Sequence, residues 1–119
     1  MAVVGAGPVG LLLAARLAQL DLDVRLLEQR PVPSGRTRAV GIHPPSLERL
    51  EALGVLEPLR ATGVPICRGW AHGAKGQLLG GIKFQRARWF HPFVLSVGQP
   101  TTERVLAERL AELLPGALQ

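Results

Sequence analysis

A glycine-rich run near the start of the chain is the first stretch whose residue types could do chemistry. Gly5-Ala6-Gly7-Pro8-Val9-Gly10 fits the spacing G-x-G-x-x-G. In this spacing the first glycine allows a tight turn, the second lets a phosphate approach the backbone, and the third lets a helix pack closely on a strand. Pro8 suits the first turn of a helix, whose positive N-terminus attracts anions. We therefore expect a dinucleotide pyrophosphate to be bound by Gly5, Ala6, Gly7, Pro8 and Gly10.

The elements around these glycines make the signal more specific. The pattern predicts a strand at residues 2–4, a helix at 8–20 and a second strand at 23–27. Strand, helix and strand in so short a stretch indicate a βαβ unit with parallel strands. Glu28 ends the second strand, 18 residues after Gly10, where a carboxylate can accept hydrogen bonds from a ribose and would repel a 2′-phosphate. The competing interpretation is a solvated residue at a strand end.

The remainder of the chain predicts two further helices and several short strands. Two prolines precede a helix at 47–53 that Gly54 should end, and Pro100 opens a last helix that runs to about residue 114. Between them, residues 62–81 carry six glycines and predict turns between short strands, with clearer strands at 81–85 and 93–97. Asp21 stands at the turn after the first helix, where its tolerance of left-handed backbone angles allows the chain to reverse.

Composition restricts the class of protein. The 119 residues are 47% hydrophobic and 19% charged, as in a small globular domain. No apolar run is long enough to cross a membrane, and no signal peptide is recognisable, so we expect a cytoplasmic protein. The single Cys67 fits a reducing compartment and a half-buried position. The net charge of +5 comes from dispersed basic residues, which suits small anionic ligands better than nucleic acid.

Three ordered segments resemble class A flavoprotein monooxygenases, the para-hydroxybenzoate hydroxylase-like family. They are the run from Val3 to Leu11 with Leu27-Glu28-Gln29-Arg30, the run Gly35-Arg36-Thr37-Arg38-Ala39-Val40-Gly41-Ile42 with the following helix, and the run from Leu95 to Leu106.

The resemblance implies FAD as the cofactor rather than NAD, which shares the glycine fingerprint. It assigns Arg38 to the pyrophosphate with Arg36 beside it, and Gln99 to the flavin end. A guanidinium suits phosphate because it stays charged and binds in a bidentate way. Glu28, Gln29 and Arg30 complete the expected FAD-binding set. Read alone, the two arginines could be solvated loop residues and Gln99 a helix cap.

Other chemistry finds little support in the sequence. His43, His72 and His91 are far apart and none has metal-ligand spacing, so we expect no metal site. No residue can be named as catalytic. The aromatic residues between 70 and 93 could line an aromatic pocket, although core packing is the favoured interpretation; they are Trp70, Phe84, Trp89, Phe90 and Phe93.

The expected fold class is α/β, a Rossmann-like FAD-binding βαβ unit with the beginning of an antiparallel substrate-domain sheet. We expect residues 1–67 to be the first part of the FAD-binding domain, 68–97 to be substrate-domain strands, and 98–119 to return to the FAD-binding domain. The resemblance implies an incomplete domain, because the family completes it with downstream segments that carry an Asp-Gly and a Gly-Asp pair, and neither pair occurs in these 119 residues. Two parallel strands and one helix would then leave apolar sheet surface uncovered.

The resemblance implies hydroxylation of a phenolic or polyketide-like aromatic substrate with O2 and NADH or NADPH, in the complete enzyme. The piece alone should be inactive. Two alternatives remain, a non-catalytic remnant or interaction fragment, and an NAD-binding dehydrogenase module.

Overall fold

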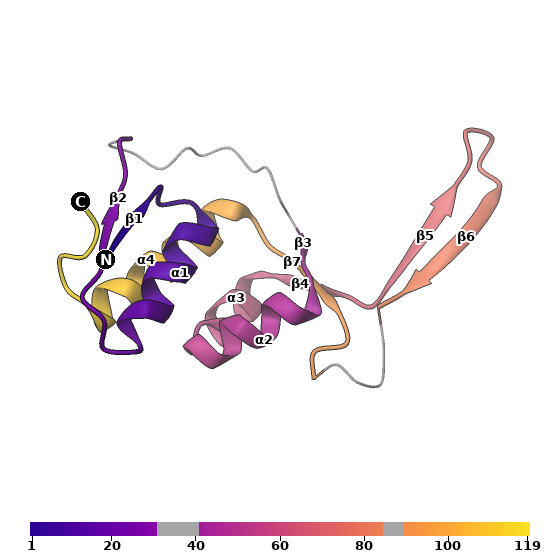
Figure 1. The fold of residues 1–119 in the computed structure, drawn as a ribbon. Coiled ribbons are helices and arrows are strands. Elements are labelled where there is room, and N and C mark those ends of the chain that lie inside the picture. Colours follow the sequence, from indigo (N-terminus) through magenta and orange to yellow (C-terminus); the bar gives the residue numbers. More distant parts are fainter. Residues whose placement is uncertain (31–40, 85–89) are drawn as a thin grey trace.

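The structure is a computed structural model that describes residues 1–30, 41–84 and 90–119. Within these residues the chain forms four helices and seven short strands (Figure 1). Their order is β1 (Ala2–Val4), α1 (Pro8–Ala18), β2 (Arg25–Leu27), β3 (Gly41–Ile42), α2 (Pro44–Leu53), α3 (Leu56–Thr62), β4 (Val64–Ile66), β5 (Arg68–His72), β6 (Leu78–Lys83), β7 (Val94–Ser96) and α4 (Gln99–Leu113).

The first three elements form the predicted βαβ unit. β1 and β2 pair in parallel, with Val3 opposite Leu26, and α1 is the crossover between them. The helix ends at Ala18, two residues earlier than the sequence pattern indicates, because the chain turns at Asp21, whose φ is +58°. The left-handed turn expected of this aspartate is therefore present, and it delays the second strand to Arg25.

A third segment joins the parallel sheet and was not anticipated. The Leu26 N–H donates to the Ala117 carbonyl at 2.7 Å, and the Gln119 N–H donates to the Leu26 carbonyl at 2.9 Å. These bonds form a parallel bridge between Leu26 and Leu118. Because β2 has neighbours on both sides, the parallel core is broader than the two strands expected from the sequence.

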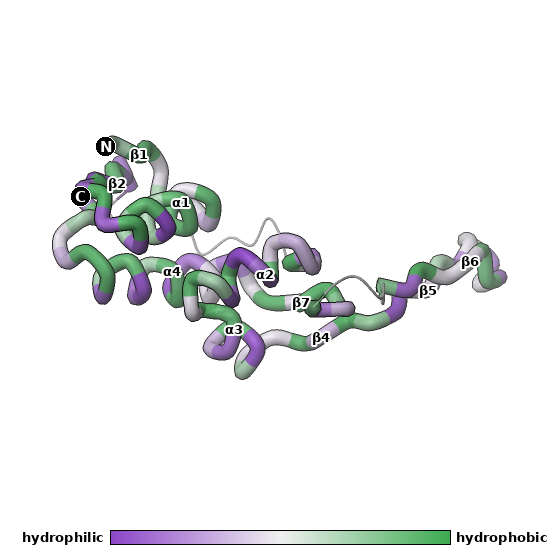
Figure 2. Tube along the Cα trace, turned by 60° about the horizontal axis from the view of Figure 1, so that its bottom comes forward, coloured by the Kyte–Doolittle hydropathy of each residue, from purple (hydrophilic) through white to green (hydrophobic). Residues whose placement is uncertain are grey.

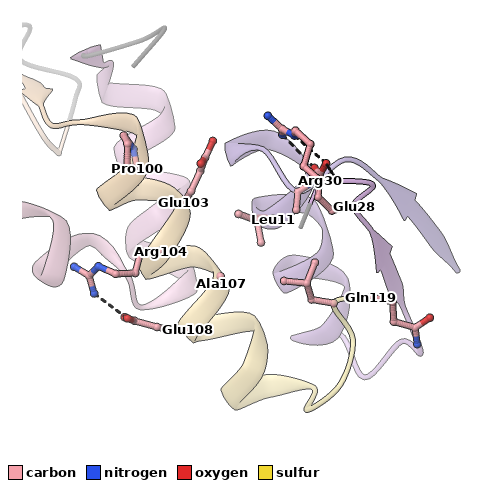
Figure 3. A pocket seen from close by; sticks show the side chains of 11 residues that line it. Leu11, Glu28, Arg30, Pro100, Glu103, Arg104, Ala107, Glu108 and Gln119 are labelled. Carbon is pink, nitrogen blue, oxygen red and sulfur yellow. Dashed lines mark hydrogen bonds and ion pairs between the residues drawn. The ribbon is translucent and has the colours of Figure 1, made fainter. Parts of the chain in front are cut away.

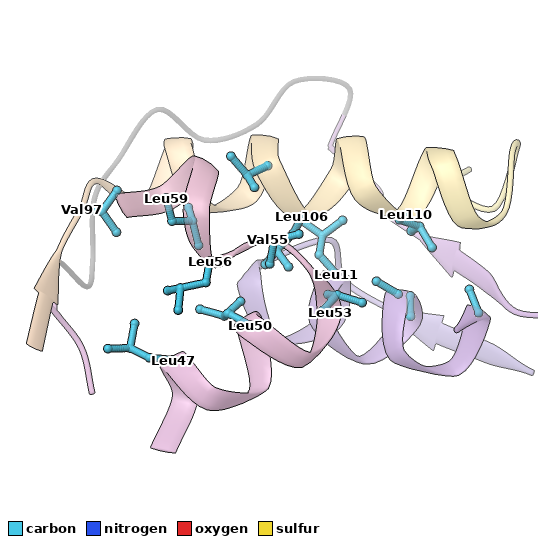
Figure 4. Close-up of a cluster of buried hydrophobic side chains, with 14 of the residues drawn as sticks. Leu11, Leu47, Leu50, Leu53, Val55, Leu56, Leu59, Val97, Leu106 and Leu110 are labelled. Atoms are coloured by element: carbon cyan, nitrogen blue, oxygen red, sulfur yellow. The ribbon is translucent and has the colours of Figure 1, made fainter. Parts of the chain in front are cut away.

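The helices enclose one apolar core. α4 packs along α1, and α2 and α3 pack against this pair (Figures 1 and 4). α3 was not expected, because seven residues are too few to show a helical period. The side chains that are almost wholly buried are mainly leucines from all four helices and β2, among them Leu11, Leu26, Leu47, Leu53, Leu59, Leu106 and Leu110.

The middle of the chain forms two small antiparallel sheets. β7 lies between β3 and β4, with Leu95 opposite both Ile42 and Pro65. β5 and β6 form a separate hairpin that projects away from the helices (Figures 1 and 2). The short strands predicted between the glycines are therefore present. β7 is not part of the hairpin and pairs with β3 and β4 instead. The division into 1–67, 68–97 and 98–119 stays a prediction.

The aromatic residues of this region do not share one environment. Phe93 is buried in the core, as expected, whereas Trp70 is 61% exposed and Phe90 is 86% exposed. The expectation of core packing was wrong for these two. The ring of Trp70 lies over Gly81 on the facing strand, since a Cβ there would meet the indole carbons. Trp89 lies outside the described residues.

Candidate functional site

The turn between β1 and α1 has the geometry that the glycine spacing predicts. Gly5 has a φ of +96°, which only glycine adopts without strain, and its N–H donates to the Leu27 carbonyl at 2.7 Å. A Cβ on Gly10 would collide with the Gly5 carbonyl oxygen, whereas a Cβ on Gly7 would meet nothing within 4 Å. Gly10 thus allows close packing, and the backbone at Gly7 faces open space.

The N-terminus of α1 begins at this turn. Gly7 is the N-cap residue, no side chain caps the helix, and Pro8 occupies its first turn. The Leu11 N–H is the first to bond within the helix, to the Gly7 carbonyl at 3.0 Å. The N–H groups that precede it and the helix dipole create a partial positive charge beside the open backbone of Gly7. This end of the helix can therefore attract an anion.

Glu28 lies at the end of β2 and faces the same turn. Its Oε2 accepts a hydrogen bond from the Ala6 N–H at 2.8 Å. Its Oε1 accepts from the backbone N–H and the Nε–H of Arg30, both at 3.0 Å. These hydrogen bonds lower the pKa of Glu28 to about 2. The largest cause is the side-chain hydrogen bond from Arg30, followed by the backbone hydrogen bonds from Arg30 and Ala6. The carboxylate is therefore ionised at neutral pH.

A cavity of about 550 Å³ opens between this cluster and α4 (Figure 3). One wall carries Ala6, Leu11, Glu28 and Arg30, and the facing helix contributes apolar and charged side chains. These are Pro100, Glu103, Arg104, Ala107 and Glu108, and the last two residues of the chain close one side. The wall residues include three carboxylates and two guanidinium groups, so the cavity offers hydrogen-bond acceptors to a ligand rich in hydroxyl or amino donors.

A second, more open cavity lies beside the first. Its lining includes Gly5 and Gln29, and it shares Glu28, Arg30 and Gln119 with the first cavity. Glu28 and Arg30 therefore lie on the boundary between the two cavities.

The structure brings together most of the predicted site residues. Gly5, Ala6, Gly7, Pro8 and Gly10 form the turn, and Glu28, Gln29 and Arg30 follow β2 directly opposite. Gln99 is the first residue of α4, where its Nε2 donates to Glu103 Oε1 at 2.8 Å. Arg36 and Arg38 lie outside the described residues. The roles assigned to all these residues in cofactor binding stay predictions.

Sequence reasoning missed Glu103 and Arg104 as cavity residues. The four-residue spacing between Gln99 and Glu103 could have suggested a side-chain pair on one helix face. It could not have shown that this face lies opposite Arg30, because the two segments are more than seventy residues apart in the sequence.

No cluster of metal ligands is found among residues 1–30, 41–84 and 90–119. His91 is buried and its Nε2 lies 2.9 Å from Glu51 Oε2, which links the segment before β7 to α2. Over the same described residues, no helix combines the length and the apolar character that a membrane crossing requires.

Residues 1–116 match the family described as FAD binding domain. The chain belongs to this family, as the N-terminal FAD-binding portion of class A aromatic hydroxylases. Among curated relatives, 6-methylpretetramide 4-monooxygenase of Streptomyces rimosus is 36% identical over 112 residues, covering 93% of this chain and 20% of the relative.

Solved structures of FAD-binding-domain proteins share the fold. The p-nitrophenol 4-monooxygenase of Pseudomonas putida has a TM-score of 0.91 and 28% identity, over 99% of this chain and 30% of that one. Aklavinone-11 hydroxylase, solved with FAD and aklavinone, has a TM-score of 0.80 and 26% identity, over 99% of this chain and 24% of that one. The chain thus spans about a fifth to a third of the length of these relatives.

Proposed function

We propose that this FAD-binding-domain chain supplies the nucleotide side of the FAD site in a monooxygenase that hydroxylates an aromatic, phenolic or polyketide-like substrate with NAD(P)H and O2. The observation that carries the proposal is the Glu28 cluster. It places an ionised carboxylate against the Ala6 N–H, beside the open backbone of Gly7 and the uncapped N-terminus of α1.

The two halves of this cluster suit different parts of a dinucleotide. Ribose hydroxyls are donors, and the Glu28 carboxylate is an acceptor that stays charged at neutral pH. A pyrophosphate is an anion, and the N-terminus of α1 attracts anions. The same carboxylate disfavours a ligand with a 2′-phosphate. FAD carries hydroxyls and pyrophosphate but no such phosphate, so it fits the residues present.

The aromatic substrate is inferred from the relatives. Two of them are named as monooxygenases of 6-methylpretetramide and of para-nitrophenol. When bound, the flavin would supply the redox and oxygen chemistry. This chain's own residues would bind and orient the nucleotide, and the complete enzyme would contain the substrate and NAD(P)H sites.

An FAD titration of the purified chain, followed by flavin fluorescence, tests the proposal. We expect saturable binding, and about tenfold weaker binding for Glu28→Gln, because a hydrogen bond to a charged group contributes about 1.5–3 kcal/mol and each 1.4 kcal/mol is a factor of ten. Glu57→Gln is the matched control, since Glu57 lies on α3, is exposed and lines neither cavity.

The other outcomes correspond to the alternatives. Binding of NADH without FAD would favour an NAD-binding dehydrogenase module. A folded chain that binds neither would favour a non-catalytic remnant or an interaction fragment.

A further inference from the structure

Two charged residues face each other across the cavity between the Glu28 cluster and α4, from elements far apart in the sequence. Arg30 follows β2 and Glu103 stands one turn into α4 (Figure 3). The pKa of Arg30 is raised mainly by its hydrogen bond and attraction to Glu28, and to a smaller extent by the charge of Glu103. Glu103 thus lies on the wall of the cavity opposite the Glu28–Arg30 pair.

Glu103 also contacts a residue of its own helix. Gln99 Nε2 donates to Glu103 Oε1 at 2.8 Å. An ionised carboxylate can only accept hydrogen bonds, so the amide nitrogen of Gln99 must be the atom that faces it. This hydrogen bond therefore determines which of the two amide atoms of Gln99, the nitrogen or the oxygen, is turned toward Glu103.

We infer that Glu103 is a positioning residue, which orients the Gln99 amide at the first turn of α4, beside the cavity that Glu103 lines. The inference rests on the proposed FAD function, and it deepens that function by naming a residue that orients Gln99, the residue predicted for the flavin end. Glu103 need not touch FAD. Its effect reaches the cofactor through Gln99 on α4.

The hydrogen-bond partner of Glu103 distinguishes it from the other glutamates of α4. Glu108 pairs with Arg104, and Glu112 pairs with Arg109. Glu103 instead bonds the neutral amide of Gln99. Its carboxylate therefore orients Gln99 and is not paired with an arginine of its own helix.

The test uses the 119-residue chain with Glu103→Ala and Glu103→Gln, and with Glu112→Ala as the matched control. Glu112 lies on the same helix and carries the same charge, but lines neither cavity. Two readouts are measured, the NMR signals of the Gln99 side-chain amide protons without ligand, and the FAD dissociation constant.

We expect Glu103→Ala to shift the Gln99 amide signals and to weaken FAD binding about three- to tenfold, the factor that corresponds to loss of one hydrogen bond. Glu103→Gln should give values between those of the wild type and Glu103→Ala in both readouts. Its amide can still accept a hydrogen bond from Gln99, but it does not fix the orientation of the Gln99 amide. Glu112→Ala should change neither readout. The Glu103→Gln variant keeps size and helix propensity, so a folded chain remains available if the alanine variant unfolds.

Gln99 signals that stay in place in both Glu103 variants would overturn the inference, whether or not FAD binds. Shifted signals with unchanged FAD affinity would overturn it as well, since the orientation would then serve no cofactor. A wild-type chain that binds no FAD would instead remove the proposed function, while the NMR readout would still decide whether Glu103 orients Gln99.

Discussion

Glu28 connects the glycine turn to the end of β2. One carboxylate oxygen holds the Ala6 N–H and the other holds Arg30, so the acid stabilises two backbone segments more than twenty residues apart. Its side chain is only 15% exposed. A residue that would accept hydrogen bonds from a ligand is thus already oriented before any ligand arrives, which lowers the ordering cost of binding.

The depressed pKa of Glu28 predicts a stability change in acid. Because its pKa in the folded chain is about 2, below the ordinary 4.5, the stability that this group contributes is present above about pH 4.5 and is lost as pH falls toward 2. Thermal unfolding of the chain and of Glu28→Gln between about pH 6 and pH 2.5 should show a difference that shrinks in acid. A difference that stays constant over this range would contradict the assignment.

Glu28 and the glycines could be predicted as site residues because their spacing carries a known geometric meaning. The sequence did not show that Ala6 and Arg30 would occupy the Glu28 carboxylate, since hydrogen-bond partners depend on distances in the fold. Glu103 was missed for the same reason. The contribution of Arg36 and Arg38 stays a prediction.

The C-terminus of α2 is held by side chains from two other helices. Arg109 on α4 donates from Nε to the Leu53 carbonyl at 3.0 Å. Gln19, which follows α1, donates to the Ala52 carbonyl at 3.1 Å. These carbonyls have no partner within their own helix, and a cation there also complements the helix dipole. The α2 end thus ties α1 and α4 together.

Removing the Arg109 contact should destabilise the chain. We expect Arg109→Met to lower the free energy of unfolding by about 1 kcal/mol, because a carbonyl in a partly buried place loses a charged donor. Arg104→Met is the matched control, since Arg104 and Glu108 form an exposed pair on the same helix, and such pairs contribute about 0–1 kcal/mol. Urea unfolding measures the free energy of unfolding of both variants. An equal decrease in the two variants would contradict a stabilising contribution from the contact between Arg109 and the Leu53 carbonyl.

Among the helices and strands, the helices that end at a helix-terminating residue were predicted best from the sequence. Gly54 ends α2 with a φ of +82°, as the sequence indicates. α3 was missed because its buried residues, Leu56 and Leu59, fill only two turns. The sequence predicts β4 only weakly, because β4 contains Pro65, which has no N–H to donate to a neighbouring strand. It is an edge strand beside β7, the position where proline is tolerated.

The whole chain is more extended than a compact domain of its length. Its radius of gyration is 16.6 Å, whereas about 13–14 Å is expected for a compact chain of this size. The β5–β6 hairpin projects away from the helices and extends the chain (Figure 1). Every residue of β6 is exposed, so the hairpin contributes little to the core that the helices share.

Exposed apolar side chains on the hairpin should promote self-association. Leu79 is 66% exposed and Ile82 is 63% exposed, and a free strand edge beside them can pair with another chain. The double substitution Leu79→Lys and Ile82→Lys should keep the chain monomeric at higher concentration, with the melting temperature unchanged. Sedimentation velocity and thermal unfolding measure the two effects.

Leu106→Lys is the contrasting variant for this experiment. Leu106 is 1% exposed, and a lysine there would bury a charge, so this variant should unfold. A large fall in melting temperature for the hairpin variant would show that the hairpin packs against the rest of the chain in solution.

The pairing of Leu26 with Leu118 has a consequence for biosynthesis. The two residues are separated by roughly ninety positions, so during translation β2 leaves the ribosome long before its second neighbour. Its outer edge is open to chaperones or to other nascent chains throughout that interval. Sites of slow translation before residue 117 would lengthen this interval, and synonymous codon choice in that region could therefore change the yield of folded protein without changing its sequence.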